Sequence, residues 1–337
     1  MTPRAGALRR CRLWWATALV LLAALGPAAC GTGRRSAATA DGTTIPVVSA
    51  PTGVEAVTVT ATTNILADVV RSIGGADIDV VDVMARGADP HSFGLSAADL
   101  QRVAESELIV TNGLGLEAGL VDALRAAADR GTTVLEVAPL LDPLPVAGEA
   151  GGALDPHVWT DPRRMATGAE RIGAAIAAEA RRSGDGQQAT RIEQGAARYA
   201  AVLRALDAEL AEKVAALAPA QRRLVTNHHA LGYFAERYGF EVLGAVIPSA
   251  STLASPSAAD LADILAVIRA AGVPAIFADS SHPTRLAEVL AEEAGTEVAV
   301  VSLHTESLGA QDGPAGTYVD AMRTNAEAIV AALGGRG

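Results

Sequence analysis

Short runs of β-branched and other apolar residues recur along the chain and predict two sets of β-strands. The first set comprises the runs 56–62, 78–84, 108–112 and 132–138. The second set comprises the runs 223–226, 240–247, 275–278 and 298–303. Each run is followed by, or alternates with, a helix-like stretch, which is the rhythm of a parallel sheet with crossover helices. The pattern therefore predicts an α/β fold with two (β/α) lobes, each built on a roughly four-stranded, mainly parallel sheet.

A long helix is predicted between the two sets of strands. Residues 187–217 contain no proline and one glycine, and their apolar side chains recur at spacings of three and four. A helix of this length would extend for about 46 Å. We expect it to form a rigid strut that joins the lobes and limits their relative motion. In the second lobe, a shorter helix is expected to have Ser255 as its N-cap and Pro256 in its first turn, and to stop at Gly272.

The first 29 residues have the layout of a signal peptide. Four arginines and no acidic residue precede an uncharged run at 13–29. Gly26-Pro27 interrupts this run, which is also short for a bilayer span of about 20 residues. A cleaved leader is therefore favoured over a permanent transmembrane helix.

Cys30 follows Ala28-Ala29 directly and resembles the cleavage site of a bacterial lipoprotein, whose cysteine becomes acylated. It would be the only cysteine of the mature chain, so no internal disulfide can form there. We expect a lipid anchor on the outer face of the cell membrane; secretion with a free thiol is the alternative. The expected domains are a signal peptide at 1–29, a flexible tether at 30–55, an N-terminal lobe at 56–186, a bridging helix at 187–218 and a C-terminal lobe at 219–337.

The net charge of the chain is strongly negative. It is −11 for the full sequence, and removal of the leader with its four arginines leaves −15. Nucleic acid is excluded as a partner because its phosphates require basic patches. Cations are the natural ligands of such a surface, although an acidic surface by itself indicates only solubility.

The six histidines all fall in expected turns or at strand ends, which suggests that they serve a purpose there. Two of them, His91 and His157, lie in repeated Asp-Pro-His tripeptides that follow strands of the first lobe. Proline stiffens each loop, and the carboxylate two residues earlier could orient the imidazole, as in many metal sites. Ser96 is expected to cap the helix after the first of these loops.

Candidate ligands also follow strands of the second lobe. In the adjacent pair His228 and His229, only one side chain is expected to face a common site, because neighbouring residues of a strand point to opposite faces. Two carboxylates compete in this lobe: Glu306, after the last strand, and Asp279, at the end of the preceding one. Either acid could instead be a helix cap or a solvated loop charge.

Every one of these candidates follows the carboxyl end of a predicted strand, the edge at which open α/β sheets bind their ligands. If two such edges face each other, His91 and His157 of one lobe meet His228 and an acid of the other. The sequence contains no His-Glu-x-x-His, no cysteine pair, no P-loop lysine motif and no dinucleotide glycine fingerprint. A metal site between the lobes is therefore the leading hypothesis.

Four ordered motifs give the chain a resemblance to a known family. The stretches 87–93, 155–162, 225–239 and 304–325 resemble the cluster A-I solute-binding lipoproteins of zinc and manganese ABC importers, the ZnuA/TroA-like proteins. This resemblance extends from about residue 56 to the C-terminus. It implies two lobes bridged by a long helix, with one metal ion between them, and ligands at His91, His157, His228 and Glu306. The family more often has aspartate where Glu306 stands, so Asp279 or a water molecule is the alternative fourth ligand.

The ligand set implied by this resemblance favours zinc. Three imidazoles and one carboxylate suit a four-coordinate zinc ion, whereas manganese prefers more oxygen ligands and a higher coordination number. The same resemblance implies glutamate at the position of His228 in manganese-type relatives. The histidine at this position is therefore the main reason to expect zinc. Residues 142–154 contain no histidine, although zinc-specific relatives often carry a His-rich loop there.

The resemblance implies an extracytoplasmic, monomeric protein that captures Zn(II) as its transported ligand and delivers it to an ABC permease. It implies no enzyme activity. The alternatives are a manganese-specific member of the same family, a zinc hydrolase and a surface adhesin. A hydrolase would require an open coordination position and a nearby general base, which a site with four protein ligands does not leave.

Overall fold

The computed structural model describes residues 55–146, 152–295 and 297–335. The predicted signal peptide, Cys30 and all of the predicted tether except Glu55 lie outside these residues. All described residues belong to the same unit of the chain, Val47–Gly337. Within the described ranges, no helix combines the length and the apolar character needed to cross a bilayer.

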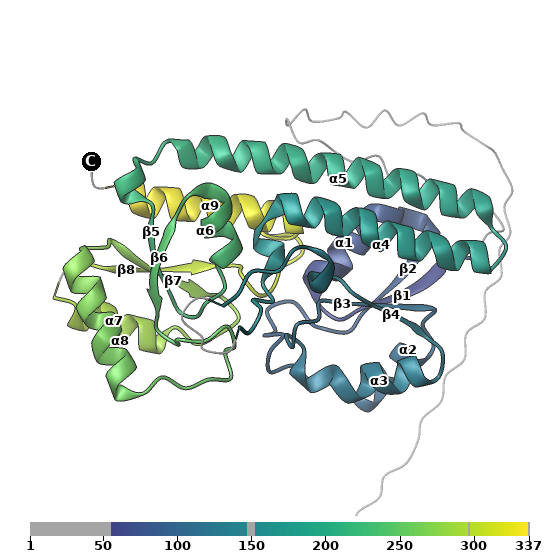
Figure 1. The fold of residues 1–337 in the computed structure, drawn as a ribbon, viewed down its shortest axis with the longest axis horizontal. Helices are drawn as coiled ribbons and strands as arrows, with labels where there is room; N and C mark the ends of the chain where they lie inside the picture. Colours follow the sequence, from purple (N-terminus) through teal and green to yellow (C-terminus); the bar gives the residue numbers. More distant parts are fainter. Residues whose placement is uncertain (1–54, 147–151, 296, 336–337) are drawn as a thin grey trace, which may run out of the picture. The chain divides into compact units, whose positions relative to one another are not determined.

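Two four-stranded sheets form the centres of the two lobes (Figure 1). The first has the order β2-β1-β3-β4 and contains β1 (Val57–Ala61), β2 (Ile78–Asp82), β3 (Leu108–Thr111) and β4 (Thr133–Glu136). The second has the order β6-β5-β7-β8 and contains β5 (Arg223–Thr226), β6 (Glu241–Ala245), β7 (Ala275–Asp279) and β8 (Ala299–Leu303). All pairs between these strands are parallel. The predicted α/β class with two lobes is confirmed.

Helices cover both faces of each sheet (Figure 1). The N-terminal lobe contains α1 (Asn64–Gly74), α2 (Ala97–Ala104), α3 (Val121–Asp129) and α4 (Pro162–Arg182). The bridging helix is α5 (Gly186–Ala215), and the C-terminal lobe contains α6 (Gly232–Tyr238), α7 (Ala258–Ala271), α8 (Arg285–Glu293) and α9 (Tyr318–Gly334). The helices α1, α4, α5 and α9 lie on one side of the two sheets, and α2, α3, α7 and α8 lie on the other.

The helix α5 runs along both lobes and is attached to each by ion pairs. The side chain of Asp185 caps its first turn by accepting two backbone N–H groups. Near this end Arg191 binds Asp77 of the N-terminal lobe at 2.7 Å. Farther along, Asp207 binds Arg237 of α6 at 2.5 Å. The helical pattern predicted residues 187–217, and the observed helix starts one residue earlier and ends two residues earlier. The boundaries of the lobes stay a prediction.

Two glycines allow α5 to approach its neighbours closely. A Cβ atom added at Gly173 of α4 would overlap the side chain of Ala196 in α5, and one added at Gly195 would overlap the carbonyl oxygen of Ile73 in α1. Close packing of backbones at these points brings α1, α4 and α5 into one layer. The layer supports the loops that leave β1 and β4.

One hydrophobic core extends through both lobes. It includes Val59 and Leu108 from the first sheet, Leu203 from α5, and Leu224 and Phe277 from the second sheet, each at most 1% exposed. Two smaller clusters lie beneath the opposite helices, one under α2 and α3 and the other under α7 and α8. Since burial of apolar surface stabilises a fold by about 25 cal/mol per Å², separation of the lobes would be opposed by this shared core.

The predicted start of α7 is wrong by two residues. Its N-cap is Ser257, whose hydroxyl accepts the backbone N–H of Asp260 at 3.2 Å, while Asp260 accepts the Ser257 N–H at 2.7 Å. This reciprocal capping box fixes the start of the helix. Pro256 therefore precedes the cap instead of occupying the first turn. The predicted stop at Gly272 and the predicted cap at Ser96 are confirmed.

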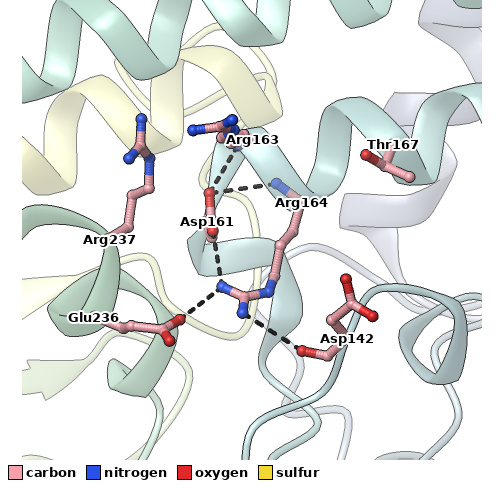
Figure 2. A pocket seen from close by; sticks show the side chains of 7 residues that line it. All are labelled: Asp142, Asp161, Arg163, Arg164, Thr167, Glu236 and Arg237. Carbon is pink, nitrogen blue, oxygen red and sulfur yellow. Dashed lines mark hydrogen bonds and ion pairs between the residues drawn. The ribbon is translucent and has the colours of Figure 1, made fainter.

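A polar contact joins α4 to α6 at the seam between the lobes (Figure 2). The guanidinium of Arg164 binds Asp161 of its own lobe at 3.0 Å and Glu236 of the other lobe at 2.9 Å. It also lies 4.9 Å from the centre of the Tyr233 ring. The seam is therefore held by charge and by aromatic packing as well as by the core.

Candidate metal centre

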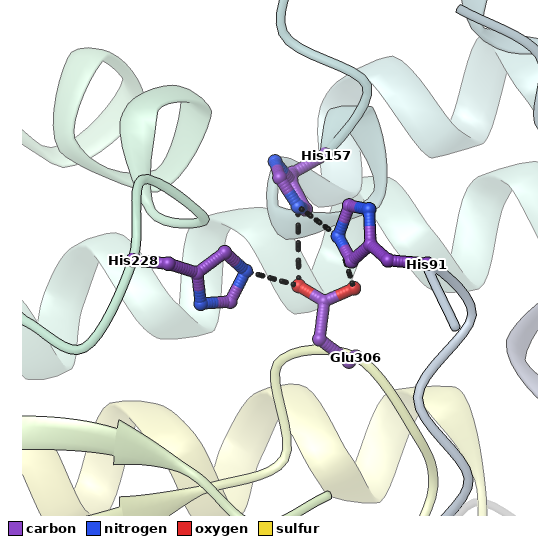
Figure 3. A group of neighbouring side chains, drawn as sticks. All are labelled: His91, His157, His228 and Glu306. Carbon is purple, nitrogen blue, oxygen red and sulfur yellow. Dashed lines mark hydrogen bonds and ion pairs between the residues drawn. The ribbon is translucent and has the colours of Figure 1, made fainter. Parts of the chain in front are cut away.

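Four side chains from four separate loops converge between the lobes (Figure 3). His91 and His157 come from loops after β2 and β4, His228 follows β5, and Glu306 follows β8. One potential ligand atom from each lies within 4.8 Å of all the others. Each side chain is at most 3% exposed. The two sheets thus direct their carboxyl ends at a common buried point, as expected from the place of each candidate after a predicted strand.

The Nε2 atoms of the three imidazoles face the carboxylate. Oε1 of Glu306 lies 3.2 Å from Nε2 of His157 and 3.1 Å from Nε2 of His228. Its other oxygen, Oε2, lies 3.7 Å from Nε2 of His91, and the Nε2 atoms of His91 and His157 are 3.4 Å apart. Three nitrogens and one carboxylate therefore gather within reach of a single ion.

Glu306 is a fully buried anion with an unused oxygen. Its Oε2 atom has no hydrogen-bond partner among the described residues. Burial would raise the pKa of Glu306, but the neighbouring His157 and His228 outweigh it and hold the pKa well below its usual range. A buried charged oxygen without a partner is costly. Such an atom fits a site at which a cation supplies the missing interaction.

His157 is held rigidly by its own loop. Oδ1 of Asp155 accepts both the backbone N–H of His157, at 2.9 Å, and its ring Nδ1, at 2.6 Å. Burial disfavours the charged imidazole, but Glu306 and Asp155 outweigh it and raise the pKa of His157 to about 10. The proton on Nδ1 directs Nε2 into the site, as the sequence suggested for an Asp-Pro-His loop.

His228 is oriented by its neighbour in the sequence. Its Nδ1 lies 3.2 Å from Oδ1 of Asn227, and the same oxygen accepts the backbone N–H of Asp279 at 3.2 Å. This second bond identifies the Asn227 atom as an acceptor, so Nδ1 of His228 must carry the proton. The Nε2 lone pair is then available to a metal ion.

The first Asp-Pro-His loop works differently from the second. Asp89 accepts the backbone N–H of His91 at 2.9 Å, as Asp155 does for His157. Its second oxygen, however, accepts the hydroxyl of Thr252 from the other lobe at 2.7 Å. Burial lowers the pKa of His91 to about 4, which keeps its imidazole neutral. Asp89 therefore fixes the loop and joins it to the opposite lobe.

The alternative candidates lie outside the cluster. Asp279 accepts the backbone N–H groups of Thr305 and Glu306, each at 3.0 Å, and so shapes the loop that presents Glu306. His229 lines a separate surface pocket together with Asp155, and its backbone N–H donates to Ser249. As expected for adjacent residues, only His228 of the pair faces the site. Neither His282 nor His304 joins the group.

Sequence reasoning missed the neutral partners of the site, Asn227 and Trp159 among them. The indole Nε1 of Trp159 donates to the carbonyl of Thr305 at 2.6 Å, next to Glu306. Its ring also meets the His157 ring edge-on at 5.2 Å. Their places in the sequence could have identified them: Asn227 directly precedes His228, and Trp159 is two residues after His157. Residues next to a ligand in a loop often orient it.

Comparisons with known proteins agree with this geometry. The chain is 32% identical to the zinc-binding protein TroA of Treponema pallidum over 82% of its own length and 88% of that protein. It is 27% identical to the manganese-binding lipoprotein MntA of Halalkalibacterium halodurans, over 80% of its length and 86% of that protein. These relatives are named for different metals, so the comparison establishes metal binding without deciding which metal.

The solved structure of periplasmic TroA from Treponema pallidum superposes on this chain with a TM-score of 0.75 at 29% identity, covering 83% of this chain and 99% of that one. Residues 59–332 match the family described as zinc-uptake complex component A periplasmic, ZnuA. Proteins of this family bind metal for transport and are not enzymes. The chain belongs to the ZnuA family of metal-binding solute-binding proteins, which confirms the resemblance predicted from its four motifs.

Proposed function

We propose that this chain captures Zn(II) outside the cytoplasm and delivers it to the permease of an ABC importer. The observation that carries the proposal is the arrangement of three Nε2 atoms around a buried glutamate, whose Oε2 has no hydrogen-bond partner in the part of the chain that the structure describes. The ligands are His91, His157, His228 and Glu306. Capture is an exchange of ligands in which three imidazoles and an ionised carboxylate replace the water around the ion, and His157 gives up its Nε2 proton as the ion binds.

The spacing of the ligand atoms supports a four-coordinate ion. With bonds of about 2.0–2.1 Å in a tetrahedron, zinc would set its ligands about 3.3 Å apart. The separations of 3.1, 3.2 and 3.4 Å around Glu306 Oε1 and His157 Nε2 are close to this value, and the 3.7 Å between His91 Nε2 and Glu306 Oε2 is somewhat longer. Manganese would require additional oxygen ligands, whereas Glu306 is the one carboxylate that the described residues bring to the cluster. Zinc is therefore the proposed cargo and manganese the alternative.

Competition between metals tests the choice of zinc. The purified chain, stripped with a chelator, is offered equal concentrations of zinc and manganese, and the bound metal is measured by elemental analysis. One zinc per chain is expected, with zinc displacing manganese. The variant His228→Ala should lose most of its zinc affinity in a calorimetric titration. Unchanged affinity in this variant, or preference for manganese in the wild type, would remove the proposal.

Acidification should release the ion, since protons compete for the imidazoles that bind it. A lower affinity for zinc at acidic than at neutral pH is the expected result. Delivery to a permease is tested in cells, where deletion of the gene should reduce zinc accumulation and where a His228→Ala copy should fail to restore it. Restoration by this variant would contradict the proposed role of the site.

Anchoring through Cys30 is the second part of the proposal. It rests on the lipoprotein-like sequence around Cys30 and on the relative named as a lipoprotein. Acyl chains bind a bilayer by about 0.8 kcal/mol per buried methylene, so more than one chain anchors firmly. Cys30→Ser should move the protein from the membrane fraction to the medium and abolish incorporation of labelled palmitate. Retention in the membrane fraction would disprove the anchor.

A further inference from the structure

The loop that carries Glu306 is held largely by the opposite lobe. We call residues 305–317 the Glu306 loop. Trp159 of the N-terminal lobe donates to the carbonyl of Thr305 at 2.6 Å. Arg86 of the same lobe donates to the carbonyls of Gly309 and Gly316, each at 2.9 Å. The fourth ligand therefore depends on contacts that cross the seam between the lobes.

Asn64 makes the crossing contacts directly after Glu306, as Trp159 makes the one directly before it. Its Nδ2 donates to the hydroxyl of Ser307 at 2.7 Å and to the carbonyl of Ala85 at 3.1 Å. Its Oδ1 accepts the backbone N–H of Leu308 at 2.9 Å. Because the Ala85 carbonyl can only accept and the Leu308 N–H can only donate, the orientation of the amide is fixed. One side chain thus binds the two residues that follow Glu306.

Ser307 completes this contact from the other side. Its hydroxyl oxygen accepts from Asn64 and also from the backbone N–H of Gly87 at 2.7 Å. Ser307 is fully buried, and Asn64 is 1% exposed. A buried polar group that loses its partner carries the full cost of its desolvation. The two side chains are therefore bound to each other much more firmly than a pair on the surface would be.

Asn64 is itself fixed in place. It is the first residue of α1, directly after Thr63, whose side chain accepts the Leu66 N–H and caps the helix. The helix α1 packs against α4 and α5. Arg86, by comparison, is only partly buried and binds farther along the Glu306 loop. Asn64 therefore holds the Glu306 loop from a fixed position in the N-terminal lobe, in addition to Asp279 of the second lobe, which accepts the Glu306 N–H at 3.0 Å.

We propose that Asn64 is a positioning residue for Glu306, and that it holds the carboxylate against the histidines and so slows the escape of a bound divalent cation. This inference rests on the proposed function, since it concerns the same site. Without the Asn64 amide, Leu308 loses its acceptor in the N-terminal lobe, and Ser307 loses one of its two hydrogen bonds to that lobe. The Glu306 carboxylate then swings away, and water takes its place on the ion.

The test compares zinc binding by the wild type and by Asn64→Ala. Affinity is measured by competition with a chromophoric chelator, and the release rate by stopped-flow mixing with excess chelator. The loss of an outer partner of a metal ligand typically lowers affinity by roughly 10–100-fold. We expect a loss of this size, mainly as faster release. With Co(II) in place of zinc, the visible absorption spectrum of Asn64→Ala should differ from that of the wild type, because water replaces a carboxylate among the ligands.

Three further variants separate positioning from general damage to the fold. Gln188→Ala is the matched control, because Gln188 is also a buried amide that donates to two backbone carbonyls, at 2.9 and 3.1 Å, far from the site. It should bind zinc with wild-type affinity. Ser307→Ala should reproduce the loss seen in Asn64→Ala. The double variant should lose little more than either single one, because both changes break the same contact.

Each outcome decides the matter. Wild-type affinity, release rate and cobalt spectrum in Asn64→Ala would overturn the positioning role and leave the proposed function intact. Losses that add in full in the double variant would also overturn it. If Asn64→Ala does not fold, Ser307→Ala alone carries the test with the same expected loss. A wild-type chain that binds neither zinc nor another divalent cation would overturn both proposals.

Discussion

A single carboxylate oxygen, Oδ1 of Asp155, accepts both the backbone N–H of His157 at 2.9 Å and the ring Nδ1 of the same residue at 2.6 Å. This double contact fixes the imidazole in position and in tautomer. The matching aspartate of the other Asp-Pro-His loop, Asp89, accepts the backbone N–H of His91 and the hydroxyls of Ser92 and Thr252 instead. The two loops share a sequence and one hydrogen bond, but differ in what orients the ring.

This difference predicts unequal effects of two equivalent substitutions. Asp155→Asn keeps an acceptor for the backbone N–H of His157. It removes the negative charge beside Nδ1 that makes Nε2 of His157 a stronger ligand for the metal ion, so zinc affinity should fall roughly 10-fold. Asp89→Asn keeps one acceptor oxygen for the His91 backbone N–H and changes no hydrogen bond to the His91 ring, so it should change affinity little. Calorimetric titration of both variants checks the prediction. Equal losses in the two would show that loop rigidity, and not the charge beside the imidazole, controls affinity.

Glu306→Gln should weaken zinc binding more than any change to an outer partner, by more than roughly 100-fold. The amide retains the size of the side chain but supplies no negative charge to the ion. Glu179→Gln is a suitable control, because Glu179 is 4% exposed, carries a buried oxygen without a hydrogen-bond partner and lies in α4 away from the site. That variant should bind zinc normally. A Glu306→Gln chain with wild-type affinity would exclude the carboxylate as a ligand.

Gly195→Ala should destabilise the fold by about 1–3 kcal/mol, the usual cost of overpacking. The new methyl group would overlap the backbone carbonyl of Ile73 and push α5 away from α1. Gly186→Ala, at the start of the same helix, meets no atom within 4 Å and should be neutral or slightly stabilising. Urea denaturation of both variants measures the difference. Equal stabilities would mean that α5 can shift freely, against the close packing described above.

Asp68 should make the stability of the chain depend on pH. Burial raises its pKa above the ordinary value of 3.8, against the opposing effects of the Tyr318 N–H and Arg86. The folded chain then binds this proton more tightly than the unfolded chain, so the carboxyl group reduces stability at neutral pH and does so less as the pH falls. Asp68→Asn keeps an acceptor for Tyr318 and does not titrate. Its melting temperature should exceed that of the wild type at neutral pH, and the excess should shrink toward pH 3.8.

An exposed aspartate provides the reference for this measurement. The Asp122 side chain is 98% exposed, and Asp122→Asn should leave the pH profile of the melting temperature as it is. An Asp68→Asn chain that melts below the wild type at neutral pH would show that the charge stabilises the fold there, through Arg86 or Arg71, more than burial opposes it.

The strands and the long helix could be predicted because each has a recognisable local pattern of apolar and polar residues. Runs of β-branched residues mark β1 and β5, and the proline-free spacing of apolar residues marks α5. The start of α7 was missed because two serines flank Pro256 and both are acceptable caps. Only the reciprocal bonds between Ser257 and Asp260 decide between them.

The site was predictable in its charged and imidazole members and not in its neutral ones. Histidines are few, and each candidate follows a strand, so the parallel topology alone brings His91, His157 and His228 to facing edges. That they bind the ion stays a prediction. Asn64 and Ser307 are 243 positions apart in the chain, and nothing near either of them in the sequence signals the other. Their contact arises from the docking of the two lobes, which local patterns do not encode.

The uninterrupted apolar interior that unites the lobes has a consequence for recognition. In a binding protein with two loosely hinged lobes, metal binding would change the relative position of the lobes, and a partner could recognise that change. In this chain, separation of the lobes would expose their shared apolar core to water. The metal-loaded and metal-free forms should therefore have nearly the same arrangement of lobes. Any partner that accepts only the loaded form must then sense the order of a few loops around the cation, among them the one that Asn64 restrains.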